Sequence, residues 1–424
     1  MPASWTRGVT GFPGEDVGLF RTQGRRGHHG GVRAVIRWTV GLLVIVHGLI
    51  HLMGAVKGFG WADVDTLHEP LGPSLGVAWL AAAALVTAAG VMLLARARGW
   101  WAVAAGGAVV SQVVITTSWG DAAAGTAGNV LLALAALYGF RSRGPASFRA
   151  RFRELAAATE QAVRAAADGA AGIVGEDDLS RLPAPVAGYV RASGAVGRPH
   201  VVGFRAAISG RIRSGADQPW MPWTGRQVNT YGAAPSRVLY MDATMKGVPA
   251  DVLHAYIGPA ATMRVRVASL LNLIDAHGPE MDQAETVTLL NDLCVLAPAA
   301  LVDAPIEWTP IDDHHARATF ANAGHPATAV LSFDDHHELV DFVSDDRLRS
   351  SADGRTFTQQ RWSTPIRDYR SFGGRRLGAL GTGRWHPEDE PAFDYLEFHV
   401  DGIDYLEVAA DGVVTPSGAP SQMP

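Results

Sequence analysis

The chain has 424 residues, a formal net charge of −5 and 18% charged residues. The negative charge and the lack of a basic, aromatic-rich patch argue against a nucleic-acid partner. A single cysteine, Cys294, cannot form an intramolecular disulfide, which is typical of a reducing compartment. The average composition hides two unlike parts of the chain. Residues 38–140 are mostly Ala, Val, Leu and Gly, while the later part has the charge density of a water-soluble domain.

Long charge-free runs follow a Gly- and Arg-rich segment at residues 1–33, which we expect to be a disordered tail. Between Arg37 and Arg141 the formal charges fall in only three short clusters. The runs between them cover residues 38–56, 70–95, 99–120 and 122–140. Crossing the hydrocarbon core of a bilayer takes about 20 apolar residues of helix. We therefore predict a four-helix transmembrane domain over residues 34–141.

The arginines indicate how these helices are oriented. They concentrate before the first run, between the second and third runs, and after the fourth, which places them on one side of the membrane. The opposite loops carry mainly acidic residues: Asp63, Asp65, Glu69 and Asp121. By the positive-inside rule we expect a multi-pass protein of the inner (plasma) membrane with both termini in the cytoplasm and with membrane lipids as partners. The first run is predicted to be a retained anchor and not a cleaved signal peptide.

Two histidines stand out within the first run. His47 and His51 are four residues apart and therefore share one face of the helix, near its middle. Ionisable groups at that depth usually face the bundle interior. Gln112 on the third helix, with nearby Ser111, Thr116 and Thr117, is available for hydrogen bonds. Two interpretations stay open: a hydrogen-bonded structural pair, or a contact to a ligand, quinone or metal.

Small residues recur four apart in the same region. Gly54 and Gly58 form one such pair, and Ala102 and Gly106 form another. This spacing lets helix backbones approach closely in lipid, where apolar burial contributes little to association. We interpret both pairs as packing positions.

A helical linker is expected over residues 142–180. Phe148, Phe152, Leu155, Ala158 and Ala162 recur at helical spacing, with arginines on other faces. This pattern predicts an amphipathic helix that leaves the membrane surface.

The soluble domain is predicted over residues 181–410, followed by a disordered tail over 411–424. Roughly a dozen alternating, strand-like segments follow one another with short connections, which favours antiparallel pairing. One amphipathic helix, over residues 281–296, interrupts them. We therefore expect an α+β domain in which a large curved antiparallel sheet carries this helix across its concave face.

The polar face of that helix holds the first candidate site residues. Glu285 and Asp292 lie on it together with Thr288 and Asn291. If this face meets the concavity of the sheet, the two carboxylates can bind a polar head group. If it faces water, they only contribute to solubility.

Large aromatic residues supply the other candidates. In a sheet they usually belong to the core, but they also line apolar ligand cavities. Three arginines, Arg317, Arg347 and Arg361, could neutralise an anionic head group, although exposure on the surface is the default for arginine. The aromatic ligand-binding candidates are Trp220, Trp223, Tyr240, Trp308, Trp362 and Trp385.

Motifs for catalysis and metal binding are lacking in the sequence, and no cofactor is assigned. We find no phosphate-binding loop, nucleophile elbow, paired Cys-x-x-Cys or His-Glu-x-x-His. His314-His315 and His336-His337 each follow two aspartates, but neighbouring strand residues point to opposite faces. Solvated hairpin tips are therefore favoured over metal ligands.

Six short segments of the soluble domain are distinctive. They begin at Leu182 (LPAPVAGY), Glu285 (ETVTLLNDLC), Ile306 (IEWTP), Trp362 (WSTP), Phe393 (FDY) and Ile403 (IDYLE). With these segments the soluble domain resembles an uncharacterised bacterial membrane-protein family of unknown function, which implies no activity. The helical part, by its helix count and small residues, is similar in layout to DoxX-like four-helix proteins. The strand series with one intervening helix resembles the half-barrel of bacterial lipoprotein carriers, which implies a concave apolar cavity for acyl chains.

The leading functional hypothesis is non-enzymatic. We expect the concave face of the sheet to bind an apolar or amphipathic small molecule, such as a lipid. One alternative is a membrane enzyme or redox component that uses the His47 and His51 pair. Another is a structural or sensory module that acts through protein contacts.

Overall fold

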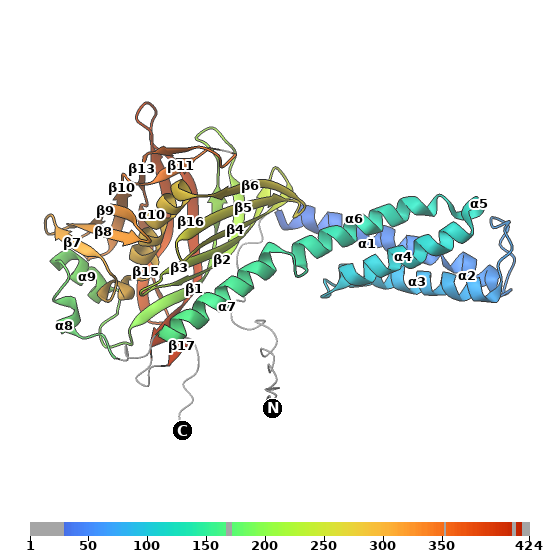
Figure 1. Ribbon diagram of the computed structural model, residues 1–424, viewed down its shortest axis with the longest axis horizontal. Coiled ribbons are helices and arrows are strands. Elements are labelled where there is room, and N and C mark those ends of the chain that lie inside the picture. Colours follow the sequence, from blue (N-terminus) through green and yellow to red (C-terminus); the bar gives the residue numbers. More distant parts are fainter. Residues whose placement is uncertain (1–28, 167–171, 352, 409–412, 418–424) are drawn as a thin grey trace, which may run out of the picture.

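The computed structural model describes residues 29–166, 172–351, 353–408 and 413–417. A long bundle of helices projects from a β domain that contains the C-terminal half of the chain (Figure 1). The tails predicted at residues 1–33 and 411–424 fall mostly outside the described residues. Where they are described, they are ordered, since a helix begins at His29 and a short strand, β17 (Val414–Pro416), pairs with β16 (Phe393–Val408).

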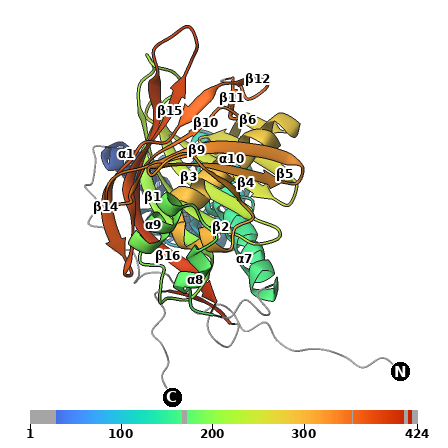
Figure 2. The same cartoon turned by 90° about the vertical axis from the view of Figure 1, so that its left-hand side faces the viewer.

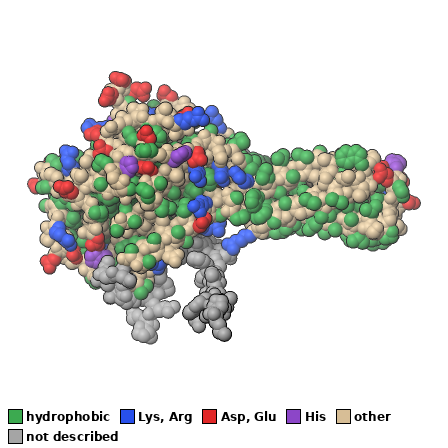
Figure 3. Space-filling model, viewed as in Figure 1, with side chains coloured by type: hydrophobic (Ala, Val, Ile, Leu, Met, Phe, Trp, Pro, Cys, Tyr) green, Lys and Arg blue, Asp and Glu red, His purple; other side chains and the backbone are tan. Residues whose placement is uncertain are grey.

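The N-terminal bundle is built from the charge-free runs. Three of its segments are long and apolar enough to cross a membrane: Ala34–Gly58, Pro73–Leu94 and Trp100–Thr117. The fourth run forms a helix that packs beside the others but is less apolar. Outward-facing side chains of the bundle are largely hydrophobic, and the acidic residues gather at its far end (Figure 3). The helices are α1 (His29–Ile50), α2 (Leu52–Gly58), α3 (Pro73–Leu94), α4 (Trp100–Thr117), α5 (Trp119–Ala122) and α6 (Gly125–Arg143).

One pair of small residues packs as predicted and the other does not. A Cβ atom placed on Gly58 would lie 2.6 Å from the Cα atom of Gly76, so α2 and α3 meet backbone to backbone. Gly54 lies against the indole of Trp79 in the same way. A Cβ atom on Gly106 would meet nothing within 4 Å. The Ala102 and Gly106 spacing therefore does not mark a close contact there.

The linker helix packs on protein. Helix α7 (Phe148–Ala166) lies along the outer face of the sheet, where Phe148, Phe152 and Ala156 contact buried residues of three strands. Near its other end, Glu160 accepts a hydrogen bond from Nε of Arg205 at 2.6 Å. Its apolar stripe is therefore covered by the sheet and not by lipid. Two short helices follow, α8 (Glu176–Leu179) and α9 (Ala184–Ala192).

One large antiparallel sheet dominates the described part of the domain. Its strand order is β6-β5-β4-β3-β2-β1-β16-β15-β13-β10-β9-β8-β7, with β14 paired to β15 and β17 to β16. β11 and β12 form a separate hairpin. The remaining strands are β1 (Val201–Ile212), β2 (Met221–Thr230), β3 (Ser236–Met245), β4 (Val248–Ile257), β5 (Ala260–Val267), β6 (Leu271–His277), β7 (Glu307–Pro310), β8 (His315–Asn322), β9 (His325–Phe333), β10 (Leu339–Ser344), β11 (Leu348–Ser350), β12 (Phe357–Gln359), β13 (Arg361–Ser363), β14 (Ile366–Phe372) and β15 (Arg375–His386).

Helix α10 (Pro279–Leu296) lies inside the curve of the sheet (Figure 2), as the sequence predicts. It is buried on almost every side, because Val287, Leu290 and Leu293 pack in the core while its polar face is covered as well. The last carbonyl groups of a helix lack partners within the helix. Here the hydroxyl groups of Tyr189 and Tyr405 donate to the carbonyls of Cys294 and Leu296 at 3.0 and 2.9 Å.

Candidate functional site

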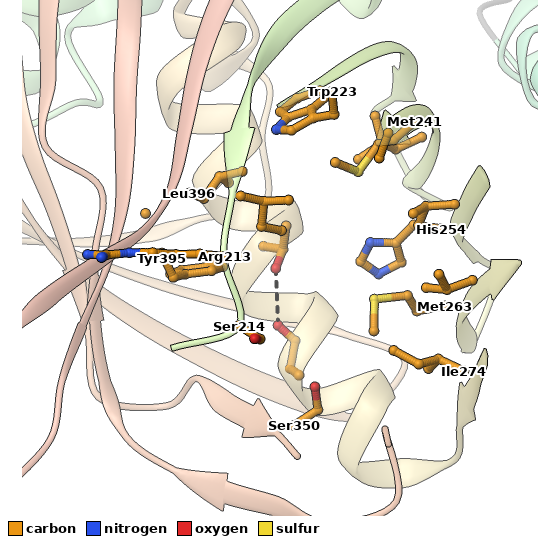
Figure 4. Close-up of a pocket in the computed structure, with 18 of the residues that line it drawn as sticks. Arg213, Ser214, Trp223, Met241, His254, Met263, Ile274, Ser350, Tyr395 and Leu396 are labelled. Carbon is orange, nitrogen blue, oxygen red and sulfur yellow. Dashed lines mark hydrogen bonds between the residues drawn. The ribbon is translucent and has the colours of Figure 1, made fainter. Parts of the chain in front are cut away.

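A cavity of about 580 Å³ lies between α10 and the concave face of the sheet. Its volume is within the range of small-molecule sites. Arg213, Tyr395 and Leu396 face Met241, His254 and others across the open space (Figure 4). The β11–β12 hairpin closes one side, where Gly354 packs against Ile274 of β6.

Strand alternation makes the walls apolar. Along β3 the odd-numbered residues Leu239, Met241, Ala243 and Met245 face the cavity, and the even-numbered ones face α7 or solvent. Methionine is unusually frequent in this lining. Its flexible thioether adapts to ligands of different shape, which suits a site for lipid-like molecules. The methionines that line the cavity are Met221, Met241, Met245, Met263 and Met281.

The floor of the cavity is a buried ionic cluster around Glu285 of α10. Its carboxylate is 3.1 Å from Nη2 of Arg347, 3.5 Å from Nη1 of Arg237 and 2.9 Å from Nε2 of His254. The side chain of Glu285 is only 1% exposed. An ionised carboxylate this deep is stable only with cationic partners, which here are the two guanidinium groups.

Asp292, two turns further along α10, holds the other half of the cluster. Its Oδ2 atom accepts hydrogen bonds from Nε of Arg237 at 2.7 Å, from Gln227 at 2.6 Å and from Asn229 at 3.2 Å. Asn291 of the same helix donates to Thr364 at 3.0 Å. The polar face of α10 therefore points into the concavity of the sheet and not into water.

The cluster is close to electrically neutral. Burial alone would raise the pKa of Glu285, but His254, Arg347 and Arg237 together hold it below its ordinary value. Burial lowers the pKa of His254, although Glu285 opposes this. Neutral His254 can accept a hydrogen bond at Nδ1 from Nη1 of Arg237, 3.1 Å away. Two guanidinium groups therefore balance two carboxylates.

Some buried polar atoms of the lining have no hydrogen-bond partner among the described residues. They include Nε of Arg347 and Nε1 of Trp223, both donors. Nε2 of His254 and Oε2 of Glu285 lie near each other but are not aligned for a hydrogen bond. Unpaired donors in a buried site are costly unless a guest supplies acceptors. The arrangement suits a ligand with an apolar body and a polar, oxygen-bearing group.

The structure brings most of the sequence-predicted candidates together at this cavity, and Arg347 joins them. Trp385 stacks near Tyr395, with ring centroids 5.4 Å apart. Arg317 and Arg361 lie elsewhere on the surface, and Arg361 pairs with Asp345. The predicted residues that line the cavity are Trp223, Glu285, Asp292, Trp362 and Trp385.

Three predicted residues lie outside the cavity, which corrects their assignment as lining residues. Tyr240 is on the outer face of β3, where it packs against Phe152 of α7. Trp308 lies on the edge strand β7 and packs against the core there. Trp220 lies in the β1–β2 loop, beside the guanidinium groups of two arginines, and not among the lining residues.

Two residues of the ionic cluster around Glu285 were missed from the sequence, Arg237 and His254. Each occupies an inward position on an otherwise apolar strand face, Arg237 in line with Leu239 and Met241, and His254 in line with Val252. A charged or ionisable residue on the apolar face of a predicted strand was the available signal. The same alternation would also have placed Tyr240 on the outer face.

The two histidines of the bundle belong to a hydrogen-bond network. Nε2 of His47 is 3.0 Å from Oδ1 of Asn129, and Nε2 of His51 is 2.7 Å from Oγ of Ser111. Asn129 in turn donates to Gln112 at 2.9 Å. The network joins α1, α4 and α6, and its polar groups satisfy one another. This arrangement favours the interpretation as a hydrogen-bonded structural pair.

The Asp-Asp-His-His segments form turns. Residues 312–314 connect β7 and β8, and residues 334–337 connect β9 and β10. His315 Nδ1 lies 2.7 Å from Asp312, which satisfies the imidazole locally. Within the described part of the chain, no group of three or more His, Cys, Asp or Glu residues is arranged to hold a metal ion.

Comparison with known proteins gives a family but no activity. The family described as "Family of unknown function (DUF6544)" matches residues 172–398. No curated protein matches the chain. Similar solved structures include a putative outer membrane lipoprotein-sorting protein domain from Vibrio parahaemolyticus, with 8% identity, a TM-score of 0.28, and coverage of 48% of this chain and 85% of that one. Another is a DUF1329 family protein from Desulfovibrio piger, with 11% identity, a TM-score of 0.30, and coverage of 52% and 92%.

Proposed function

The chain belongs to DUF6544, a family of unknown function, and we propose from its own cavity that it is a membrane-anchored binding protein for an amphipathic, lipid-like ligand. The observation that carries the proposal is the largely apolar cavity with a buried polar floor. Apolar walls bind by excluding water, and a few fixed polar groups orient the guest.

The floor is built for binding and carries little that favours a reaction. Its carboxylates are held by guanidinium groups, and its histidine is kept neutral by burial. A general base needs a free, suitably placed lone pair and a substrate proton within reach. Glu285 and Asp292 are instead committed to structural ion pairs, which leaves orientation of a head group as their role.

The bundle is the membrane anchor in this proposal. α1 with α2, then α3, α4 and α6 would make four crossings over residues 34–141. The linker over 142–180 and the β domain over 181–410 would then lie on the side of Arg96, Arg98, Arg141 and Arg143. By the positive-inside rule that side is the cytoplasm. Asp121 at the far end accepts hydrogen bonds from the backbone of His68 and Glu69, which ties the outer loops together.

Native mass spectrometry of the full-length protein from mild detergent tests ligand binding. We expect a bound species with the mass of a lipid or related amphiphile. Ala243 and Ala250 are register partners on β3 and β4, and both line the cavity. Ala243→Phe places a ring inside that space and should abolish the bound species. Ala321→Phe, at an exposed position of β8, is the matched control and should retain it.

An empty cavity in the wild-type protein, or equal binding by both phenylalanine variants, would reject the proposal. Sidedness is tested separately with Asp65→Cys and Gln218→Cys in a Cys294→Ala background. A membrane-impermeant maleimide added to intact spheroplasts should label only the first variant. Labelling of the second alone would place the β domain outside the cytoplasm.

A further inference from the structure

The mouth of the cavity lies at one end of the strands. Most of the lining is buried or half-buried, and its exposed members come from the β1–β2 loop, the β3–β4 turn and the start of β6. The strand register places these three connections at the same end, since Ile212 pairs with Met221 and Met245 with Val248. The exposed lining residues are Ser214, Gln218, Pro219, Lys246 and Leu273.

That end of the sheet is also the one joined to the helical bundle. Ala250, just after the β3–β4 turn, pairs with Val267 at the end of β5. The neighbouring Arg266 donates to the carbonyl of Ala146 at 3.3 Å, and its guanidinium lies 3.9 Å from the ring centroid of Phe148. Ala146 and Phe148 directly follow α6, the last helix of the bundle. The mouth and the bundle are therefore neighbours.

The rim of the mouth has the composition of a bilayer contact. Leu271, Leu273 and Val248 are 69%, 51% and 41% exposed, although they are apolar. Lys246 lies beside them in the β3–β4 turn and is also exposed. Exposed apolar side chains with an adjacent cation are typical of segments that rest at the interface of an anionic leaflet.

An ionic cluster lies at the deep end of the cavity. The walls are mainly apolar, the mouth combines Leu273 with Ser214, Gln218 and Lys246, and Glu285, Arg237 and His254 lie at the buried floor. A lipid in the adjoining leaflet presents its polar group at the membrane surface and its chain in the hydrocarbon. If it moves straight into the mouth, the polar group leads, reaches the floor first, and the chain follows along the methionine-rich walls.

We propose that the cavity takes its ligand directly from the bilayer leaflet beside it, with the polar group entering first through the rim formed by Val248, Leu271 and Leu273. The inference rests on the proposed function, since it assumes an amphipathic ligand. Because the floor is nearly charge-balanced, the fitting head group is neutral and rich in acceptor oxygens. A monoacylglycerol has this chemistry.

Photo-crosslinking in vesicles tests the direction of entry. Full-length protein is reconstituted in phosphatidylethanolamine and phosphatidylglycerol vesicles that contain a monoacylglycerol with a diazirine on its acyl chain. One probe carries the diazirine next to the ester and the other at the chain end. The first should label peptides of the floor, around Thr288 and Gln227, and the second should label those around Met245 and Leu273. The reverse pattern would overturn head-first entry and leave ligand binding intact.

Rim variants test the route. Val248→Asp with Leu271→Asp changes two rim residues that do not line the cavity itself. This variant should reduce labelling of the cavity from vesicles by about tenfold, because two apolar contacts with the leaflet are lost. Labelling by probe supplied in detergent micelles should not change, which shows that the variant is folded and the cavity intact. Ile311→Asp changes an equally exposed residue at the opposite end of the sheet and should behave as wild type in both media.

The outcomes separate the two proposals. If the rim variant and the Ile311 variant lost cavity labelling equally in vesicles, uptake through this rim would be rejected. Retained labelling in the rim variant would reject it as well. Absence of cavity labelling in vesicles and in micelles would reject ligand binding itself. Competition by unlabelled monoacylglycerol that exceeds competition by palmitate would support the neutral head group, and stronger competition by palmitate would contradict it.

Discussion

Nε of Arg237 donates a hydrogen bond of 2.7 Å to Oδ2 of Asp292, and both side chains lie at the floor of the cavity. One residue is on β3 and the other on α10, so this pair joins the helix to the sheet that encloses it. Arg237 also approaches Glu285, 3.5 Å away. The ion pair therefore sets both the position of α10 and the polarity of the site.

Removing one partner of this pair should strongly destabilise the β domain. Arg237→Met leaves Asp292 buried and without its cation, which typically costs about 3–5 kcal/mol. Arg237→Met combined with Asp292→Leu should recover part of that loss. The free energy of unfolding from denaturant titrations measures both. Arg361→Met breaks the exposed pair with Asp345 and should cost less than about 1 kcal/mol. Similar decreases in the free energy of unfolding for Arg237→Met and Arg361→Met would contradict the role of Arg237 in holding α10 to the sheet.

Cys294 provides a built-in probe of that unfolding. It is the single cysteine of the chain, and burial in the last turn of α10 raises the pKa of its thiol. A thiol that is both inaccessible and protonated reacts only when the domain opens. In native protein a maleimide should react roughly a thousandfold more slowly than after denaturation. Fast labelling of the native state would mean that α10 is not held inside the sheet.

Stability should fall in mild acid because of His254. Burial lowers its pKa in the folded protein, while the unfolded chain takes up the proton near pH 6.5. The stabilising contribution is therefore complete above about pH 6.5 and declines below it, by at most about 1.4 kcal/mol per pH unit. Glu285, Arg237 and Arg347 all face this imidazole. Unfolding titrations between pH 7.5 and 5 should show a steeper decline for the wild type than for His254→Gln, and parallel curves would refute the assignment.

Ionisation of Asp341 on β10 should make the fold less stable as the pH rises, which is opposite to the effect of His254. Burial raises the pKa of Asp341 to about 6, although the backbone N–H of Phe342 partly offsets this. The folded state thus prefers the protonated acid, and ionisation at higher pH destabilises it. Asp341→Asn should be more stable than wild type at pH 8 by about 1 kcal/mol after allowance for its partial exposure, with the gap closing near pH 4. A gap that is independent of pH would show that the substitution acts through packing instead.

Local patterns determined much of the architecture. The charge-free runs predicted the apolar helices, and the polar face of residues 281–296 predicted the one helix inside the sheet. Both signals depend on chemistry that recurs at fixed spacing along one segment. The face of α10 that meets the cavity could not be chosen from its own sequence. That choice depends on the arginines of β3 and of the segment before β11, which are distant in the chain.

The aromatic candidates show the limit of reasoning from residue type. Trp223 and Tyr240 are on neighbouring strands and are both aromatic, yet they lie on opposite faces of the sheet. Successive residues of a strand point to opposite faces of the sheet, so the face on which each aromatic residue lies depends on its position in the strand. Assigning these positions requires the correct strand register. The network of His47, Asn129 and Ser111 needs contacts among three helices, which no single segment encodes.

Close packing of α2 on α3 gives the sharpest test of the bundle. Gly58→Ala would place a methyl group 2.6 Å from the Cα atom of Gly76, and backbone cannot move aside as a flexible side chain can. The helices must separate, at a cost of about 1–3 kcal/mol from overpacking. Gly106→Ala on α4 meets open space, so it should be neutral or should stabilise the bundle through better helix propensity.

Both alanine variants can be compared by circular dichroism during unfolding in rising fractions of sodium dodecyl sulfate. The midpoint for Gly58→Ala should fall, and that for Gly106→Ala should stay or rise. Because the floor of the cavity lies far from α2, ligand retention in detergent should be the same in both variants. If the unfolding midpoint fell equally for Gly106→Ala and Gly58→Ala, then glycine content, and not the contact with Gly76, would determine the stability of the bundle.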